Sequence, residues 1–183
     1  KVFWRKVLDI FATSIDYDAT TSLAVDFFKT IQNKMHWAAH GHTAAEIIYQ
    51  RVDAGKPHLG LTNYKGSQPT KQETEIAKNY LTTDELDILN RMVTAFLEIA
   101  EIQAISRQVM YMRDWVERLD GFLKLTNKNI LDNAGSISHH DAIVKAHQAY
   151  ESYKEKTKND LSQVENDFIK QLEAETKQLK NKK

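Results

Sequence analysis

Three histidines near residue 40, His36, His40 and His42, are the first candidates for metal binding. His36 and His40 are four residues apart, so both would lie on one face of a helix, the spacing at which two imidazoles chelate zinc. The residues between them are Trp-Ala-Ala, which lack the general base of the HExxH pattern. The three histidines are therefore a candidate metal site, and packing of His36 into an apolar core is the alternative.

A second candidate site surrounds the irregular segment 53–70, which holds five of the eight Gly and Pro residues of the chain. Its basic side chains could converge on a phosphate or carboxylate, and its glycines would let backbone N–H groups approach that ligand. No Walker or GxGxxG spacing is present, so the alternative is that Arg51 pairs with an acid and the glycines only make turns. The candidate ligand-binding residues are Arg51, Asp53, Lys56, Lys65, Lys78 and Asn79.

The composition excludes several classes of protein. Among 183 residues, 25 basic and 25 acidic side chains give a formal net charge of zero, whereas non-specific binding to DNA or to an acidic membrane needs a basic excess. The absence of Cys removes disulfides, thiol nucleophiles and Cys-ligated zinc. No stretch approaches the roughly 18 consecutive apolar residues of a membrane span. We expect a cytoplasmic protein without a cofactor, and we assign no catalytic residue.

Hydrophobic periodicity predicts an all-α protein. Apolar residues recur at helical spacing over residues 2–12, from about 22 to 40, 44–52, 83–106 and 112–125. Shorter helical segments are expected at 129–135 and at 76–81, the latter in a helix that Thr70 and Glu73 would open. Residues 59–64 could form at most an edge strand. Gly41 is expected to end the second of the long helices.

The starts of three helices carry the same local signature, a Thr followed three residues later by Glu. In this capping box the Thr hydroxyl accepts from the Glu backbone N–H, and the Glu carboxylate accepts from the Thr N–H. The pairs are Thr43 with Glu46, Thr70 with Glu73, and Thr82 with Glu85. Ser138 and Asp141 are expected to cap the last helix in a similar way.

The expected architecture is a multi-helix bundle around the apolar helix 83–106, which is apolar on most of its circumference and should have neighbours on two sides. Residues 1–138 would form the compact domain. Residues 139–183 would form one long helix with a charged tail that projects or pairs with another chain. The residues near coiled-coil spacing are Tyr150, Tyr153, Leu161, Val164, Phe168, Leu172 and Leu179.

Several blocks of the sequence resemble one bacterial family. They are NKMHWAAHGHTAAEIIYQR (33–51), KPHLGLTNYKG (56–66), IAKNYL (76–81), ELDILNRMVTAFLEIAEIQA (85–104) and MRDWVERLDGFL (112–123). In this order they look like the C-terminal region of the RhuM family of virulence proteins, over most of residues 1 to about 155. The resemblance implies a KilA/Bro-like DNA-binding segment ahead of this region, and the first residue is not Met. We therefore expect the chain to begin inside a longer protein.

The RhuM resemblance implies no reaction and no catalytic residue. Its members are often titled Fic proteins, but Fic-type AMP transfer needs a His followed by a Gly-Asn-Gly anion nest, and this sequence has none. The leading hypothesis is a non-enzymatic regulatory and oligomerisation domain of a DNA-binding protein, which forms homo-oligomers through its C-terminal helix. The alternatives are a toxin-like nuclease or nucleotidyl transferase with its site at 53–70, and a helical adaptor that binds a host protein.

Overall fold

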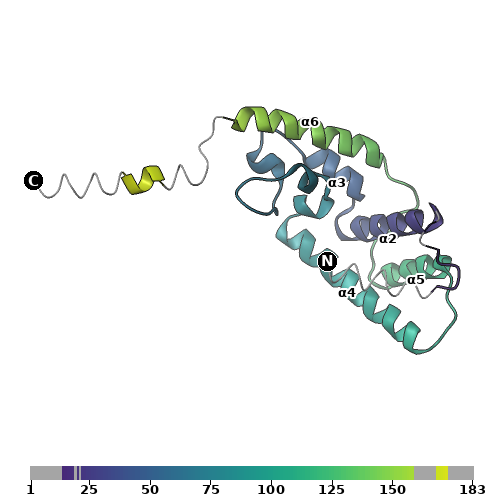
Figure 1. Ribbon diagram of the computed structural model, residues 1–183. Coiled ribbons are helices and arrows are strands. Elements are labelled where there is room, and N and C mark those ends of the chain that lie inside the picture. The colour runs from purple at the N-terminus through teal and green to yellow at the C-terminus, as the bar shows by residue number, and fades with distance from the viewer. Residues whose placement is uncertain (1–13, 19, 21, 159–167, 173–183) are drawn as a thin grey trace, which may run out of the picture.

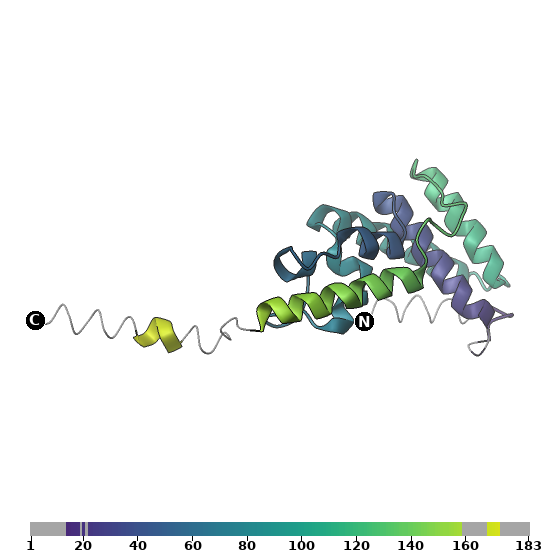
Figure 2. The same ribbon diagram turned by 90° about the horizontal axis from the view of Figure 1, so that it is seen from above.

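The computed structural model describes residues 14–18, 20, 22–158 and 168–172, and in these ranges the chain is helical with irregular connections and no strand. Figures 1 and 2 show the arrangement of the helices from two sides. The prediction of an all-α bundle is confirmed. The helix expected over residues 2–12 and most of the tail beyond 158 lie outside the described residues.

Four helices have nearly the predicted bounds: α2 is Ser22–His40, α3 is Ala44–Arg51, α4 is Thr83–Ile105 and α5 is Met112–Leu125. Helix α6, His139–Thr157, begins at the predicted residue and covers the first part of the long helix expected over 139–183. Gly41 follows α2 with a φ of 77°, a left-handed conformation that glycine adopts without a steric penalty. The capping boxes at the starts of α3 and α4 are both complete. Ser138 caps α6 by accepting from the Asp141 backbone N–H.

Three short segments differ from the prediction. The helix expected at 76–81 is replaced by two 3₁₀ turns, η2 (Lys71–Glu75) and η3 (Ala77–Tyr80), and the Thr70–Glu73 box caps the first of them. A further 3₁₀ turn, η1, covers Pro57–Gly60, where the strand at 59–64 was an option. Residues 129–135 are not helical, because the loop is held by contacts with α2 and α3 rather than by its own backbone hydrogen bonds.

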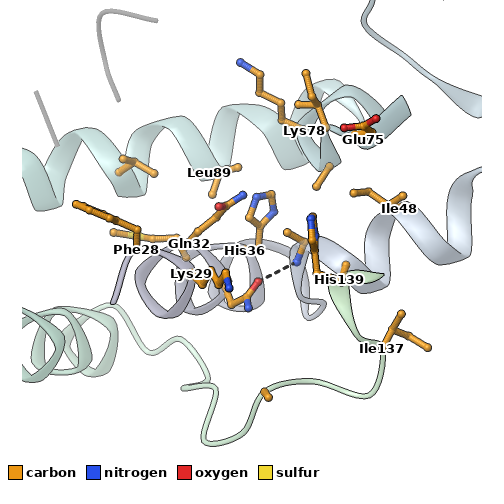
Figure 3. Close-up of a pocket in the computed structure, with 18 of the residues that line it drawn as sticks. Phe28, Lys29, Gln32, His36, Ile48, Glu75, Lys78, Leu89, Ile137 and His139 are labelled. Atoms are coloured by element: carbon orange, nitrogen blue, oxygen red, sulfur yellow. Dashed lines mark hydrogen bonds between the residues drawn. The ribbon is translucent and has the colours of Figure 1, made fainter. Parts of the chain in front are cut away.

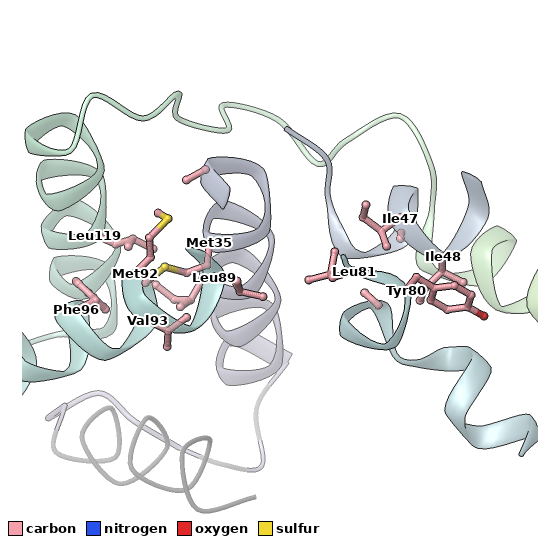
Figure 4. Close-up of a cluster of buried hydrophobic side chains, with 14 of the residues drawn as sticks. Met35, Ile47, Ile48, Tyr80, Leu81, Leu89, Met92, Val93, Phe96 and Leu119 are labelled. Atoms are coloured by element: carbon pink, nitrogen blue, oxygen red, sulfur yellow. The ribbon is translucent and has the colours of Figure 1, made fainter. Parts of the chain in front are cut away.

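The described residues form two packed groups of helices. In the first group, α2 packs against α4 and α5; in the second, α6 lies along α3 and contacts η1 and η2, while α3 contacts η3. Helix α2 also contacts α3, which joins the groups. Figure 4 shows side chains of the hydrophobic core cluster that both groups share, with Met92, Phe96 and Leu119 from the first group and Ile48 and Tyr80 from the second.

The core of the first group contains polar anchors as well as apolar side chains. Trp115 is 1% exposed, and its indole Nε1 donates to the Ser14 hydroxyl at 3.0 Å. Lys34 on α2 donates to Asp120 on α5 and to the Leu131 carbonyl at 3.0 Å. The buried ammonium therefore ties the loop after α5 back onto α2.

Helix α4 is buried on one side and exposed on the other. Leu89, Met92, Val93 and Phe96 are buried against the core. On the other side, Ile88 is 38% exposed and Ile102 is 59% exposed. The expectation of neighbours on two sides of this helix is thus met on one side within the described part of the chain.

Helix α6 packs on the same core as the preceding helices. Ala142 and Ala146 are fully buried against the second group, and Lys145 Nζ donates to the Tyr49 carbonyl at 2.6 Å. Tyr150 and Tyr153, the first residues of the expected coiled-coil seam, also pack against this core. Residues 139–157 therefore pack against the preceding helices, and most of the segment expected to project, beyond residue 158, lies outside the described residues.

Candidate functional site

A cavity of about 810 Å³ lies where the two groups of helices meet. Its lining comes from α2, α3, α4, the η2–η3 segment and the end of the loop that precedes α6. Figure 3 shows Phe28, Gln32 and His36 on one side of the cavity, with Leu89 and Lys78 on the other. This volume falls in the range of small-molecule sites, which are roughly 300–1,000 Å³.

The inner wall of the cavity is almost entirely apolar. Its buried members are Met35, Ala45, Ile48, Ala77, Leu89 and Val93, together with one polar residue, His36. The charged members lie at the edge, where Lys29 and Lys78 are exposed and Glu75 is half-buried and paired with His147 at 2.7 Å. Water therefore solvates the charges at the rim, while the interior presents a single imidazole.

His36 is 4% exposed and forms a pair with the next histidine of the same helix face. Its Nδ1 lies 2.9 Å from Nε2 of His40, so one of these nitrogens donates to the other. Burial, together with a smaller effect of the neighbouring His40, lowers the pKa of His36 to about 3. Burial also lowers the pKa of His40 to about 4. Both rings are therefore neutral at physiological pH.

The histidine pair connects the cavity to the junction between α3 and α4. His40 lies in the electrostatic field of Glu85 and Arg51, which act on its pKa in opposite directions. Arg51 binds Glu85 through two hydrogen bonds of 2.6 Å and also donates to the Tyr80 carbonyl at 2.8 Å. The acidic partner of Arg51 is thus Glu85, whose carboxylate also forms part of the capping box of α4.

The three candidate metal ligands lie next to one another, with ring centroids 5.1 Å apart for His36 and His40 and 6.2 Å apart for His40 and His42. His42 Nδ1 contacts the His40 carbonyl at 3.0 Å, while His36 and His40 are hydrogen bonded to each other through their rings. Within the described ranges, no group of three or more His, Cys, Asp or Glu side chains is arranged to hold a metal ion. His36 and His40 lie on one face of α2, as their spacing predicts, and in this structure their rings form a hydrogen bond with each other.

The candidate ligand-binding residues around 53–70 have different surroundings in the structure. Arg51 is engaged by Glu85, and Asp53 accepts from the Gly55 backbone N–H at 2.8 Å. Lys56 and Lys65 are exposed, and of the six candidates Lys78 alone lines the cavity described above.

Asn79, the last of the six, is buried inside the fold. Its side-chain amide donates to the Glu73 backbone carbonyl at 3.0 Å, and its backbone carbonyl accepts from the Thr62 backbone N–H at 2.7 Å. Asn79 therefore links residue 62 to residue 73 by hydrogen bonds, and it does not line the cavity.

Segment 53–70 contains a strained turn with a structural role. His58, Leu59 and Gly60 have φ values of 51°, 62° and 79°, and Leu59 is fully buried. The Leu59 carbonyl accepts from the Asp53 backbone N–H at 3.2 Å. The left-handed turn thus inserts a leucine into the core beside the end of α3, at a cost that the surrounding contacts offset.

We expect Gly60→Ala to lower the free energy of unfolding by about 2 kcal/mol or more. A Cβ at this position would lie 2.5 Å from the backbone oxygen of Arg51, in addition to adopting a positive φ. Gly66 is the matched control, because it has the same φ of 79° and nothing within 4 Å of its Cβ position. Gly66→Ala should cost only about 1 kcal/mol in urea denaturation. Equal losses in the two variants would show that close approach at Gly60 is unimportant.

The wall of the cavity was not apparent from the sequence, although part of its signal was present. Phe28, Gln32 and His36 follow one another at four-residue spacing and face the cavity from α2. This spacing identifies a shared helix face, but it does not distinguish a face that is packed from one that borders a void.

A comparison with protein-family models matches residues 1–161 to the virulence protein RhuM family. The chain belongs to this family. The RhuM match covers both groups of helices and every residue that lines the cavity. A search of curated proteins and a search of solved structures found no match to this RhuM protein.

In the described part of this RhuM protein, no helix is both long enough and apolar enough to cross a membrane.

Proposed function

We propose that this RhuM chain is a non-enzymatic regulatory and oligomerisation domain of a DNA-binding protein, and that the cavity between its helix groups is its sensing element. The observation that carries the proposal is the position of the cavity. Its walls come from both groups, with α2 and α4 from one and α3 and η3 from the other. A ligand there would contact both groups at once and stabilise one relative placement of them.

The balanced charge of the chain supports a role apart from direct DNA contact. With a formal net charge of zero, the chain lacks the basic excess that a phosphate-binding surface needs. The enzymatic alternative required the cations around 53–70 to face one cleft, and Arg51 is instead committed to Glu85. These observations favour regulation over nuclease or nucleotidyl-transfer chemistry.

A thermal-shift screen of small apolar fragments tests the sensing role. A ligand present at 100 times its dissociation constant and bound only to the folded state adds about 2.7 kcal/mol of stability. Ala45→Trp, which places a large ring in the cavity wall, should abolish the shifts. Ala95→Trp, at an exposed site on α4 outside the lining, should retain them. No stabilising fragment, or equal shifts in both variants, would contradict the proposal.

We propose in addition that residues beyond 158 carry self-association. Leu161, Val164, Phe168 and Leu172 continue the coiled-coil spacing of the sequence. Sedimentation of the full chain at tens of micromolar should therefore give a dimer or higher oligomer. A chain that ends at residue 158 keeps α6 on the core and should sediment as a monomer. A monomeric full chain would refute this part of the proposal.

A further inference from the structure

We propose that the cavity takes a small, uncharged and mainly apolar molecule with one hydroxyl or carbonyl group, which hydrogen bonds to Nε2 of His36. The proposal rests on the sensing role given above and specifies the chemistry of the ligand. The proposed ligand chemistry follows from the positions of the polar lining residues, which are charged at the rim of the cavity and limited to His36 among the buried lining residues.

Charge is confined to the rim of the cavity. Lys29 lies on an exposed part of α2, 3.5 Å from Asp26, and Lys78 is exposed on η3. Glu75 is already bonded to His147. A carboxylate or ammonium placed deep in the cavity would lose its water and meet no opposite charge, which is strongly unfavourable. The interior therefore favours an uncharged ligand.

His36 gives the interior its specificity. It is the only buried polar side chain among the described lining residues, and Figure 3 shows its ring pointing into the cavity beside Gln32. Its Nδ1 is used by His40, and within the described part of the chain no hydrogen bond is made to its Nε2. Nε2 of His36 is not among the buried unpaired side-chain atoms of the described residues, so it borders the open space of the cavity. A ligand group can therefore pair with it in place of water.

The His36–His40 pair can present either a donor or an acceptor to the cavity. If His40 donates to His36, then Nε2 of His36 carries the proton and donates to the ligand. If His36 donates to His40, Nε2 is a bare acceptor. A hydroxyl group satisfies both cases, because it can donate and accept. This makes an alcohol the suitable probe of the site.

The experiment compares three probes of similar size, 1-phenylethanol, ethylbenzene and benzoate, by NMR titration of the full chain. We expect His36→Phe to weaken binding of 1-phenylethanol about fivefold, the equivalent of one neutral hydrogen bond, and to leave ethylbenzene within twofold. Benzoate should bind more weakly than 1-phenylethanol. His140→Phe, which changes an exposed histidine outside the lining, should alter none of the three affinities.

The outcomes separate this proposal from the sensing role. If ethylbenzene and 1-phenylethanol both bind and His36→Phe affects them equally, the His36 contact is wrong while the cavity remains a binding site. Tighter binding of benzoate would also overturn the choice of an uncharged ligand. If none of the probes binds, the sensing role itself fails. Should His36→Phe not fold, the Nε2 resonance of His36 in the wild-type chain decides: it should shift with 1-phenylethanol and stay in place with ethylbenzene.

Discussion

Replacing Arg51 by Met should lower the free energy of unfolding by about 3 kcal/mol, the largest loss that we expect from a single substitution. Arg51 holds Glu85 at 2.6 Å through both terminal nitrogens and also binds the Tyr80 carbonyl. The two side chains are 27% and 22% exposed, so solvent screens this pair only partly. Removing one partner of a shielded pair leaves the other charge without compensation, which typically costs 3–5 kcal/mol when burial is complete.

The control for Arg51 is another arginine–carboxylate pair on the surface. Arg91 and Asp87 are 2.7 Å apart on α4, with side chains that are 78% and 57% exposed. Exposed pairs contribute little, so Arg91→Met should leave the unfolding free energy nearly unchanged. Arg51→Lys should not restore stability, because an ammonium cannot make the planar two-point contact. Chemical denaturation at pH 7 measures all three variants, and similar losses at Arg51 and Arg91 would contradict this account.

Glu46→Gln should cost about 2–3 kcal/mol at pH 7. The carboxylate is 5% exposed and accepts from the Thr43 backbone N–H and from both the backbone N–H and hydroxyl of Ser136, each at 2.7 Å. An amide can accept at one atom only and would turn its NH₂ group toward a donor. The matched control is Glu73→Gln, which alters the same capping motif at an exposed site and should be much milder.

The loss of unfolding free energy caused by Glu46→Gln should also depend on pH, and it should become smaller in acid. Burial acts to raise the pKa of Glu46, but the hydrogen bonds from Ser136 and Thr43 outweigh it and hold the pKa at about 2, against an ordinary value of 4.5. A depressed pKa means that the ionised carboxylate stabilises the fold, so its contribution is complete above about pH 4.5 and is lost as the pH falls toward 2. The integrated effect is about 3 kcal/mol.

Unfolding free energies of the wild-type and Glu46→Gln chains between pH 7 and pH 2 test this linkage. The difference between the two chains should be constant above pH 5 and should shrink as the pH falls through 4.5 to 2. Glu85, whose pKa the Arg51 contact lowers to about 2, titrates in both chains and cancels in the difference. A difference that does not change with pH would show that the carboxylate of Glu46 is not ionised in the folded protein.

The sequence by itself determined the elements that depend on near neighbours. Helical periodicity predicted α2, α3, α4 and α5 close to their observed bounds, and the Thr-x-x-Glu signature located three helix or 3₁₀ starts. These features rest on hydrogen bonds and side-chain contacts within three or four residues, so the local sequence contains all the participants. The same local reasoning failed at 129–135, where the loop is held by Lys34 and Glu46 from distant helices.

The three capping boxes show most clearly what only the tertiary structure decided. They are alike in sequence, yet Glu73 remains at the surface, Glu46 is buried under Ser136 and Glu85 is clamped by Arg51. The Ser136 and Arg51 contacts join residues that are 90 and 34 positions apart in the chain. The cavity has the same origin, because His36, Ile48, Ala77 and Leu89 border one space only after the two helix groups have packed. Local sequence specifies which face of a helix is apolar, and the packing of whole helices determines whether that face meets a neighbour or encloses a void.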